Sequence, residues 1–361
     1  MKNISLYLFI VLSFLSCKKV SNIQLKFVDE HVIQDSISFK NTIIGGVSGI
    51  DFHNNQYYMV VDDARNPRVL VGDIEIDDDK ITKVNFKKII KLNDTTVQFY
   101  KENALDLESV FVDDFEQINL VSEGKIYKGK NPSVFTIDKN GNFIEQLQVP
   151  EYFNANSKAK PKHNGVFEGS TKSFNNKGFW VAMEAPIKAD GEEPTFHKTQ
   201  SPIRITYFDY QSKKATKQFA YQLEKIDKPA KGNINLNGVT AILEYAENQF
   251  FVIERIYQSG YGALGNTVRV FKATINDAST NTLDIQSLKE ADYIPLKKEL
   301  LFDFDSVRNQ LTDKVVDNIE GITLGPKLSN GNQSLILVSD DNFQIYGKQL
   351  NQFILLEIVK E

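Results

Sequence analysis

Acidic side chains recur at equivalent positions along this sequence, and carboxylates gathered in one place can bind metal ions or exchange protons. Five segments share one pattern: a Gly-containing start, an apolar strand, a short polar turn and a second apolar strand that ends in acidic residues. The carboxylates at these positions are Asp62, Asp63, Glu108, Glu123, Glu168, Glu184, Glu254, Glu320, Asp340 and Asp341. Because clustered carboxylates repel one another, some must be protonated, pair with arginine or bind a cation.

The residue types favour calcium as that cation. Hard oxygen ligands suit Ca²⁺ better than zinc, and the histidines show no metal-ligand spacing such as His-x-x-x-His. The residues expected to hold Ca²⁺ are Asp62, Asp63, Glu108, Glu123, Glu184, Glu254, Asp340 and Asp341.

Two further roles follow for residues in the same repeat positions. Glu168 and Glu320 are the candidates for a carboxylate that acts as a general base. Arg65 and Arg255 are the counter-charges, and we expect them to bind substrate phosphate together with Asn342.

Strand pairing predicts where the acidic side chains meet. In an antiparallel hairpin, the start of the first strand lies beside the end of the second. Glu320 starts a strand and Asp340 and Asp341 end its partner, and Glu108 is paired with Glu123 by the same rule. If the first strand of each repeat lines the axis of a propeller, these groups converge at one mouth of its channel. For any one of them, an ordinary turn residue facing water is the alternative.

The repeat predicts an all-β fold. Most copies continue into two further strands, and four antiparallel strands are the unit of a propeller blade. We expect a single β-propeller over residues 24–361, with five blades by repeat count and six as the alternative. The last copy has one clear further strand, residues 352–359, so residues 24–32 are expected to supply its outer strand and close the ring. A two-sheet sandwich would not explain the recurring acidic position.

The N-terminus has the pattern of an export signal. Lys2 precedes an apolar run over residues 4–15, too short to span a bilayer comfortably but right for a signal sequence. The following Ser16-Cys17 resembles a bacterial lipobox, and Cys17 is the only cysteine in the chain. We therefore predict a signal peptide over residues 1–16, lipidation of Cys17 and a tether over residues 17–23. The alternative is a cleaved signal with an incidental cysteine.

The lipid would anchor the protein to a membrane of the bacterial cell envelope, on the exported side. The net charge of −5 argues against a nucleic-acid partner. We expect a monomer.

The acidic repeats also carry a family resemblance. The motifs that carry it are Gly45-Gly46-Val47-Ser48-Gly49 with Asp62-Asp63, Asn164-Gly165-Val166-Phe167-Glu168-Gly169, Met183-Glu184-Ala185-Pro186, Glu254-Arg255, and Asn318-Ile319-Glu320-Gly321 with Ser339-Asp340-Asp341-Asn342-Phe343. With these motifs in order, the chain resembles the phytase-like propeller family, described as having esterase-like activity of phytase, over residues 40–359. The second repeat departs from the pattern, with Ser109 after Glu108 where Gly would be typical. The resemblance implies an exported propeller that hydrolyses a small phosphorylated or ester substrate.

Two classes of function fit these observations. The first is a Ca²⁺-dependent phosphoester or ester hydrolase. The second is a non-catalytic propeller that binds a cation, a ligand or a partner protein at its acidic mouth. A serine esterase is a weaker variant, because Ser48 lacks the Gly-x-Ser-x-Gly pattern and no histidine is placed by the sequence to activate it.

Overall fold

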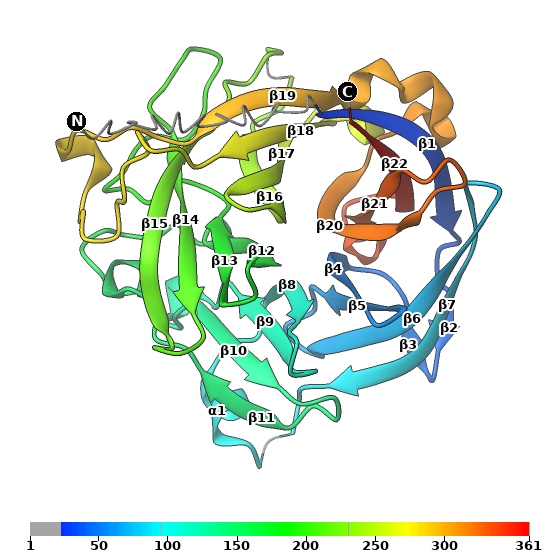
Figure 1. Cartoon of the computed structure of the whole chain (residues 1–361), viewed down its shortest axis with the longest axis horizontal. Coiled ribbons are helices and arrows are strands. Elements are labelled where there is room, and N and C mark those ends of the chain that lie inside the picture. Colours follow the sequence, from blue (N-terminus) through cyan, green and yellow to red (C-terminus); the bar gives the residue numbers. More distant parts are fainter. Residues whose placement is uncertain (1–22, 95, 230, 361) are drawn as a thin grey trace, which may run out of the picture.

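Antiparallel strands form five four-stranded sheets arranged around a common axis, which confirms the predicted five-bladed propeller (Figure 1). The computed structural model describes residues 23–94, 96–229 and 231–360.

Blade 1 contains β4 (Val47–His53), β5 (Gln56–Val61), β6 (Arg68–Asp77) and β7 (Lys80–Lys91). Blade 2 contains β8 (Leu107–Val112), β9 (Ile118–Ser122), β10 (Ser133–Ile137) and β11 (Phe143–Gln146). Blade 3 contains β12 (Phe167–Lys172), β13 (Gly178–Met183), β14 (Pro202–Asp209) and β15 (Lys214–Gln222). Blade 4 contains β16 (Asn235–Ala246), β17 (Gln249–Gln258), β18 (Asn266–Thr274) and β19 (Lys297–Asp303).

Blade 5 is built from both ends of the described chain. It contains β20 (Asn318–Lys327), β21 (Gln333–Asp340), β22 (Asn351–Lys360) and, as its outer strand, β1 (Ile23–Ile33). Strands β1 and β22 pair antiparallel from Ile23 opposite Lys360 to Ile33 opposite Asn351. The expected closure of the ring by the N-terminal strand is therefore confirmed. The predicted signal peptide and Cys17 lie outside the described residues.

Small elements decorate the loops between these strands. The short hairpin of β2 (Ser38–Phe39) and β3 (Thr42–Ile43) follows β1, and α1 (Gln98–Glu102) joins blade 1 to blade 2. Within the described parts of the chain, no helix is long and apolar enough to cross a membrane.

The first strand of each repeat is the innermost one, as the sequence predicts. Strands β4, β8, β12, β16 and β20 each occupy one edge of their sheet, and they surround the axis in Figure 1. Each lies against the innermost strand of the next blade, and β20 lies against β4 to complete the circle. All five innermost strands begin at the same end of the propeller, which we call the mouth.

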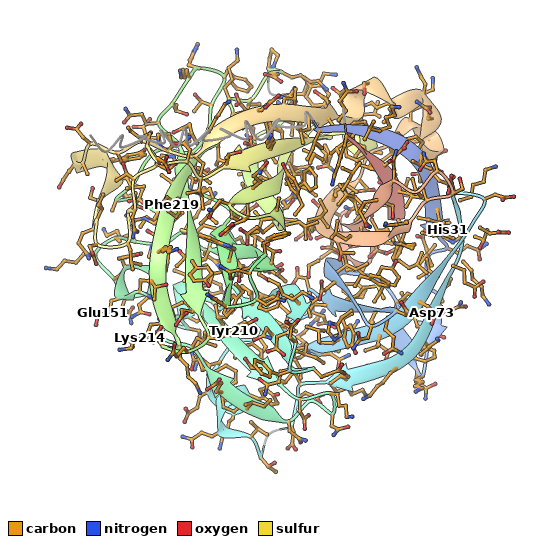
Figure 2. All side chains as sticks on the ribbon, viewed as in Figure 1. His31, Asp73, Glu151, Tyr210, Lys214 and Phe219 are labelled. Carbon is orange, nitrogen blue, oxygen red and sulfur yellow. The ribbon has the colours of Figure 1, made fainter. Side chains whose placement is uncertain are left out.

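Apolar side chains from both faces of each sheet hold the blades together. The second strands are almost wholly buried: Met59, Val60 and Val61 of β5 have no exposed surface, and the same is true of Val252 and Ile253 in β17. Side chains fill the space between neighbouring sheets (Figure 2). A strand packed on both faces must be apolar at successive positions, which explains the uninterrupted apolar runs of the sequence.

One long connection is held by a buried ion pair. Residues 275–296 join β18 to β19, and they lie against blade 3. The guanidinium of Arg204 donates to both carboxylate oxygens of Asp190 at 2.6 and 2.7 Å, with both side chains fully buried. Asp190 also accepts the backbone N–H of Leu288, and Arg204 donates to the carbonyl of Thr282. This pair therefore fixes the connection to the neighbouring blade.

We predict that removing β1 opens the ring. A chain that begins at Gln34 lacks the buried side chains of Ile23, Leu25 and Ile33, each stabilising the fold by roughly 1.5–3 kcal/mol. It also leaves the edge of β22 unpaired and prone to aggregation. We expect a loss of about 5 kcal/mol or more in the free energy of unfolding, measured by denaturant titration. A chain that begins at Ile23 is the control and should keep full stability; equal stability of the two chains would contradict the closure.

Candidate functional site at the mouth of the propeller

A β-bulge recurs near the mouth end of every innermost strand. The register with the second strand shifts between Val47 and Gly49, Leu107 and Ser109, Phe167 and Ser170, Val239 and Ala241, and Ile319 and Gly321. A bulge leaves its extra residue unpaired and re-aims the side chain. The residues at the bulges are Ser48, Glu108, Glu168 with Gly169, Thr240 and Glu320.

The bulged residues divide into two chemical types. Blades 2, 3 and 5 carry a glutamate, whereas blades 1 and 4 carry a hydroxyl. The Ser48 hydroxyl donates to the carbonyl of Leu107, and the Thr240 hydroxyl donates to the carbonyl of Ile319, both at 2.8 Å. Each hydroxyl therefore ties its innermost strand to the next blade, and Ser48 serves the scaffold.

Five carboxylates from blades 1, 2 and 3 form a compact group, which we call the carboxylate cluster. Carboxylate oxygens of Asp62, Asp106 and Glu108 lie within 4.8 Å of one another, and so do those of Glu108, Glu123 and Glu168. Glu108 belongs to both sets. Two oxygen-ligand sets that share a carboxylate are suited to hold one cation or two neighbouring cations.

Burial and mutual repulsion hold protons on this cluster. Burial, followed by the charge of Glu168 and Asp62, raises the pKa of Glu108 well above its ordinary value. Burial, then Glu184 and Asp106, raises the pKa of Glu123 to about 8, although the N–H of Gly165 donates to its carboxylate at 3.1 Å. Asp62, Glu108, Glu123 and Glu168 therefore hold protons more strongly than free carboxyl groups do, and a cation that displaces these protons removes the repulsion.

Arg255 organises a second group at the mouth, which we call the arginine group. Its Nη2 lies 3.3 Å from Glu184 Oε1 and 3.6 Å from Glu320 Oε1, and its Nη1 donates to Asn318 Oδ1. Asn318 in turn donates to Glu320 at 2.8 Å. Burial raises the pKa of Glu320 to about 8 even though Arg255 opposes the shift. The buried Nε of Arg255 has no hydrogen-bond partner among the described residues.

Asp340 lies between the two groups. It is buried, and the backbone N–H of Asn342 donates to it at 2.6 Å. Burial, then the charge of Glu320, raises its pKa well above the ordinary value, and Asp340 in turn raises the pKa of Asp62. Asn342 contributes this backbone contact from a left-handed conformation with φ 45°.

Four of the predicted site residues are directed away from both groups. Asp63 forms an ion pair with Arg68 at 3.0 Å, and the Arg65 side chain is 98% exposed, 3.9 Å from Asp63. Asp341 accepts from the N–H of Gly46 at 2.7 Å and also from Phe343, Gln344 and Asn351. The last is Glu254, which accepts from Tyr221, Asn237, Lys298 and the backbone N–H of Glu224. Asp63, Asp341 and Glu254 therefore support loops and blades rather than the cluster, and Arg65 extends into solvent.

One member of the cluster is missing from the sequence pattern. Asp106 precedes β8 and therefore lies outside the strand ends that the repeat restates. The spacing in the sequence could have identified it. Asp106 stands two residues before Glu108, and side chains two residues apart in an extended chain lie on the same face. The backbone N–H of Glu123 donates to the carbonyl of Asp106, which fixes this segment at the mouth.

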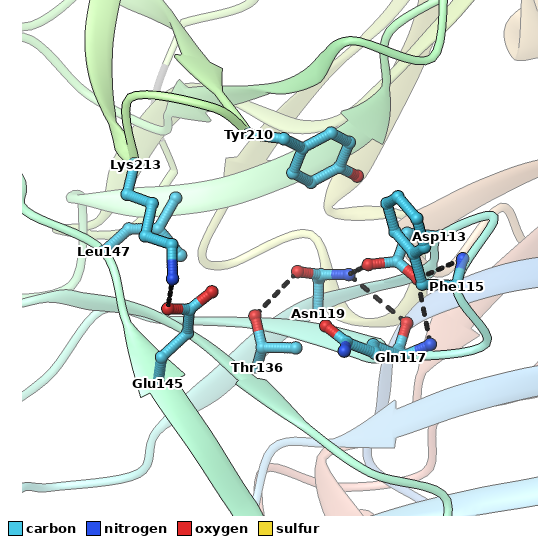
Figure 3. A pocket seen from close by; sticks show the side chains of 9 residues that line it. All are labelled: Asp113, Phe115, Gln117, Asn119, Thr136, Glu145, Leu147, Tyr210 and Lys213. Atoms are coloured by element: carbon cyan, nitrogen blue, oxygen red, sulfur yellow. Dashed lines mark hydrogen bonds and ion pairs between the residues drawn. The ribbon is translucent and has the colours of Figure 1, made fainter.

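A separate cavity of about 220 Å³ lies away from the mouth, between blades 2 and 3 (Figure 3). Most of its polar side chains satisfy one another: Asn119 donates to Asp113 and accepts from Thr136, and Lys213 pairs with Glu145. The buried hydroxyl of Tyr210 has no partner among the described residues, which a single water molecule can satisfy. The mouth is therefore the better candidate for the functional site.

The fold and the mouth define a class, a five-bladed β-propeller with a carboxylate cluster at one end of its axis. The chain belongs to the phytase-like family, whose model carries the description "Esterase-like activity of phytase" and matches residues 42–343. This span contains the whole cluster and the arginine group. No curated protein matches the sequence.

Solved propellers resemble the chain in fold. An endo-arabinase from Bacteroides thetaiotaomicron is 9% identical with a TM-score of 0.45, and the match covers 88% of this chain and 95% of that one. A β-1,3-galactosidase of glycoside hydrolase family 43, bound to galactodeoxynojirimycin, is 11% identical with a TM-score of 0.47 and coverages of 91% and 93%. An endo-1,4-β-xylanase from Bacteroides thetaiotaomicron is 9% identical with a TM-score of 0.42 and coverages of 86% and 90%. These likenesses carry no argument about activity.

The pKa shifts predict how the metal-free protein responds to pH. Glu123 and Glu320 titrate near 4.5 when unfolded and at about 8 when folded. The folded state therefore keeps protons that the unfolded state releases, so stability falls as pH rises from 4.5 to about 8. We expect Glu108→Gln to flatten this fall in thermal melts with chelator, because it removes one ionisable group. Asp341→Asn is the matched comparison and should lose about 2 kcal/mol at every pH, since an amide cannot accept all four hydrogen bonds. If the stability of Glu108→Gln fell as steeply with rising pH as that of the unmodified protein, the result would argue against repulsion among the clustered carboxylates.

Proposed function

We propose that this protein is a Ca²⁺-dependent hydrolase of phosphoesters, acting at the mouth of the propeller. The observation that carries the proposal is the pair of carboxylate sets sharing Glu108. Family membership supports hydrolysis of an ester or phosphoester bond.

The donor set fits calcium. Asp62, Asp106, Glu108, Glu123 and Glu168 offer only oxygen atoms, and burial and neighbouring carboxylates raise the pKa values of Asp62, Glu108, Glu123 and Glu168. The chemistry that Ca²⁺ supplies in such a site is neutralisation of phosphate charge and polarisation of the scissile bond. Glu168 belongs to this donor set, so of the two candidate bases Glu320 is the one left free for proton transfer.

The arginine group supplies the remaining roles. Glu320 has a pKa of about 8, close to the working pH, as an efficient proton acceptor or donor requires. Arg255 fixes its position and offers the unpartnered Nε to an anionic oxygen of the substrate. Glu184 contacts the same Nη2 as Glu320 does, so that Arg255 stays oriented when substrate leaves.

Thermal melts and turnover measurements test this proposal together. We expect Ca²⁺ to raise the melting temperature of the protein, and Glu108→Gln to abolish that rise. Glu320→Gln should keep the calcium-induced rise but lower turnover of p-nitrophenyl phosphate at least about 100-fold. Melts that do not respond to Ca²⁺ in the unmodified protein would contradict the metal site. A calcium response without turnover of any phosphoester or carboxylic ester would support the non-catalytic propeller instead.

We further propose that the protein is a lipoprotein of the cell envelope, anchored through Cys17. The support is the sequence pattern of residues 1–17 and the solitary cysteine. In a bacterial host that processes lipoproteins, Cys17→Ala should move the protein from the membrane fraction to the soluble exported fraction. The control is Ser16→Ala, which keeps a small residue before the cysteine and should leave the protein with membranes. Membrane association of the Cys17→Ala protein would refute the anchor.

A further inference from the structure

Basic side chains gather on one side of the mouth, in a protein whose net charge is −5. They come from three loops: residues 123–132 between β9 and β10, residues 147–166 between β11 and β12, and residues 184–201 between β13 and β14. We call this surface the lysine rim, and it consists of Lys125, Lys128, Lys130, Lys158, Lys160 and Lys188.

The backbone brings these three loops together. Lys125 and Lys130 exchange N–H···O=C hydrogen bonds across a tight turn. The N–H of Lys188 donates to the carbonyl of Lys160 at 3.3 Å. The ring of His163, from the second loop, lies 4.5 Å from the ring of Tyr127 in the first. The rim is therefore one continuous surface rather than scattered charges.

Carboxylates do not neutralise the rim. None of its six lysines has a carboxylate within 4 Å among residues 23–94, 96–229 and 231–360, whereas nearby Lys162 pairs with Glu193 at 2.9 Å. Like charges on adjoining loops repel one another, and an anion bridging them removes that repulsion. A ligand with repeated negative charges gains the most affinity. Once one of its charged groups is bound to a lysine, its next charged group is held at a high effective concentration beside the next lysine.

An aromatic ring within the rim narrows the class of ligand. Tyr127 is 61% exposed, and the amines of Lys125 and Lys128 lie 5.6 and 5.8 Å from its ring centre. An exposed ring gains free energy when it packs against an apolar surface. Sugar rings present such a surface through their C–H groups, whereas inorganic polyphosphate has none. The juxtaposition of ring and amines therefore fits a polymer that alternates C–H faces with carboxylates.

We propose that the lysine rim is a docking surface for an acidic polysaccharide. The amines of the rim bind the uronate carboxylates, and Tyr127 packs against a sugar ring between them. Docking at the rim holds the polymer beside the mouth, because the same loop reaches the mouth carboxylates. The N–H of Gly165 donates to Glu123, and the charge of Lys162 acts on Glu184.

Binding to polygalacturonate in the presence of chelator tests the proposal without calcium bridging. The rim variant Lys128→Gln/Lys158→Gln/Lys188→Gln removes three positive charges from the rim. We expect it to bind at least about tenfold more weakly than the unmodified protein at low salt, and the affinity of the unmodified protein to fall as salt rises. Neutral dextran should not bind.

The matched control removes the same charge elsewhere. Lys80 and Lys214 are the first residues of β7 and β15, and Lys177 directly precedes β13, so all three lie at the opposite end of the propeller, where they are exposed. The triple Gln variant at these positions should bind polygalacturonate within about twofold of the unmodified protein, because screened charges at that distance contribute little. Equal losses in the two triple variants would reduce the effect to net charge and overturn the proposal, as would an absence of binding by the unmodified protein.

Tyr127→Ser separates a polysaccharide from other polyanions. We expect it to weaken binding of polygalacturonate several-fold and to leave binding of inorganic polyphosphate unchanged. Preferential binding of polyphosphate, with no effect of Tyr127→Ser on either polymer, would contradict the assignment. All binding is measured with chelator and without turnover, so the outcome does not depend on the proposed hydrolysis.

Discussion

The repeated β-bulge is the constraint on which the mouth depends. One residue near the start of each innermost strand, or two in blade 3, is freed from the ladder at the mouth end of the strand. The type of that residue then decides its role. Glu108 and Glu320 bring carboxyl groups to the mouth, whereas the hydroxyls of Ser48 and Thr240 donate hydrogen bonds to the neighbouring blade. The same β-bulge therefore positions both the carboxyl groups of the mouth and the hydroxyls that join neighbouring blades.

The charge at the mouth is compensated unevenly. Blades 3, 4 and 5 place Glu184 and Glu320 around Arg255, whose charge opposes the rise in their pKa values that burial causes. Blades 1, 2 and 3 supply the carboxylate cluster, which forms no ion pair with a basic side chain among the described residues. Desolvation makes the difference large, because a buried carboxylate without a counter-charge strongly favours its neutral form. The side that lacks an internal cation is thus the side suited to receive one.

Rigid surroundings hold this arrangement in place. Asp341 and Glu254, although acidic, accept several hydrogen bonds each. Asp341 holds the loop after β21, and Glu254 links the outer strand β15 of blade 3 to the outer strand β19 of blade 4. Ring closure by β1 and β22 keeps blade 5, and with it Glu320, against blade 1. The loops of blades 2 and 3 add the lysine rim, so the mouth face offers carboxylates for a cation beside amines for an anion.

The sequence by itself determined the architecture. Its repeats predicted the five blades, the innermost position of the first strand and the closure of the ring, because these follow from local strand and turn patterns. Tertiary structure alone decided which acids meet. Adjacent side chains point to opposite sides of a strand, so Asp62 joins the cluster while Asp63 pairs with Arg68. By the same alternation, Arg255 faces the mouth while Glu254 turns to Lys298. A strand end does not reveal which of two neighbours faces inward, because a one-residue bulge exchanges the two sides.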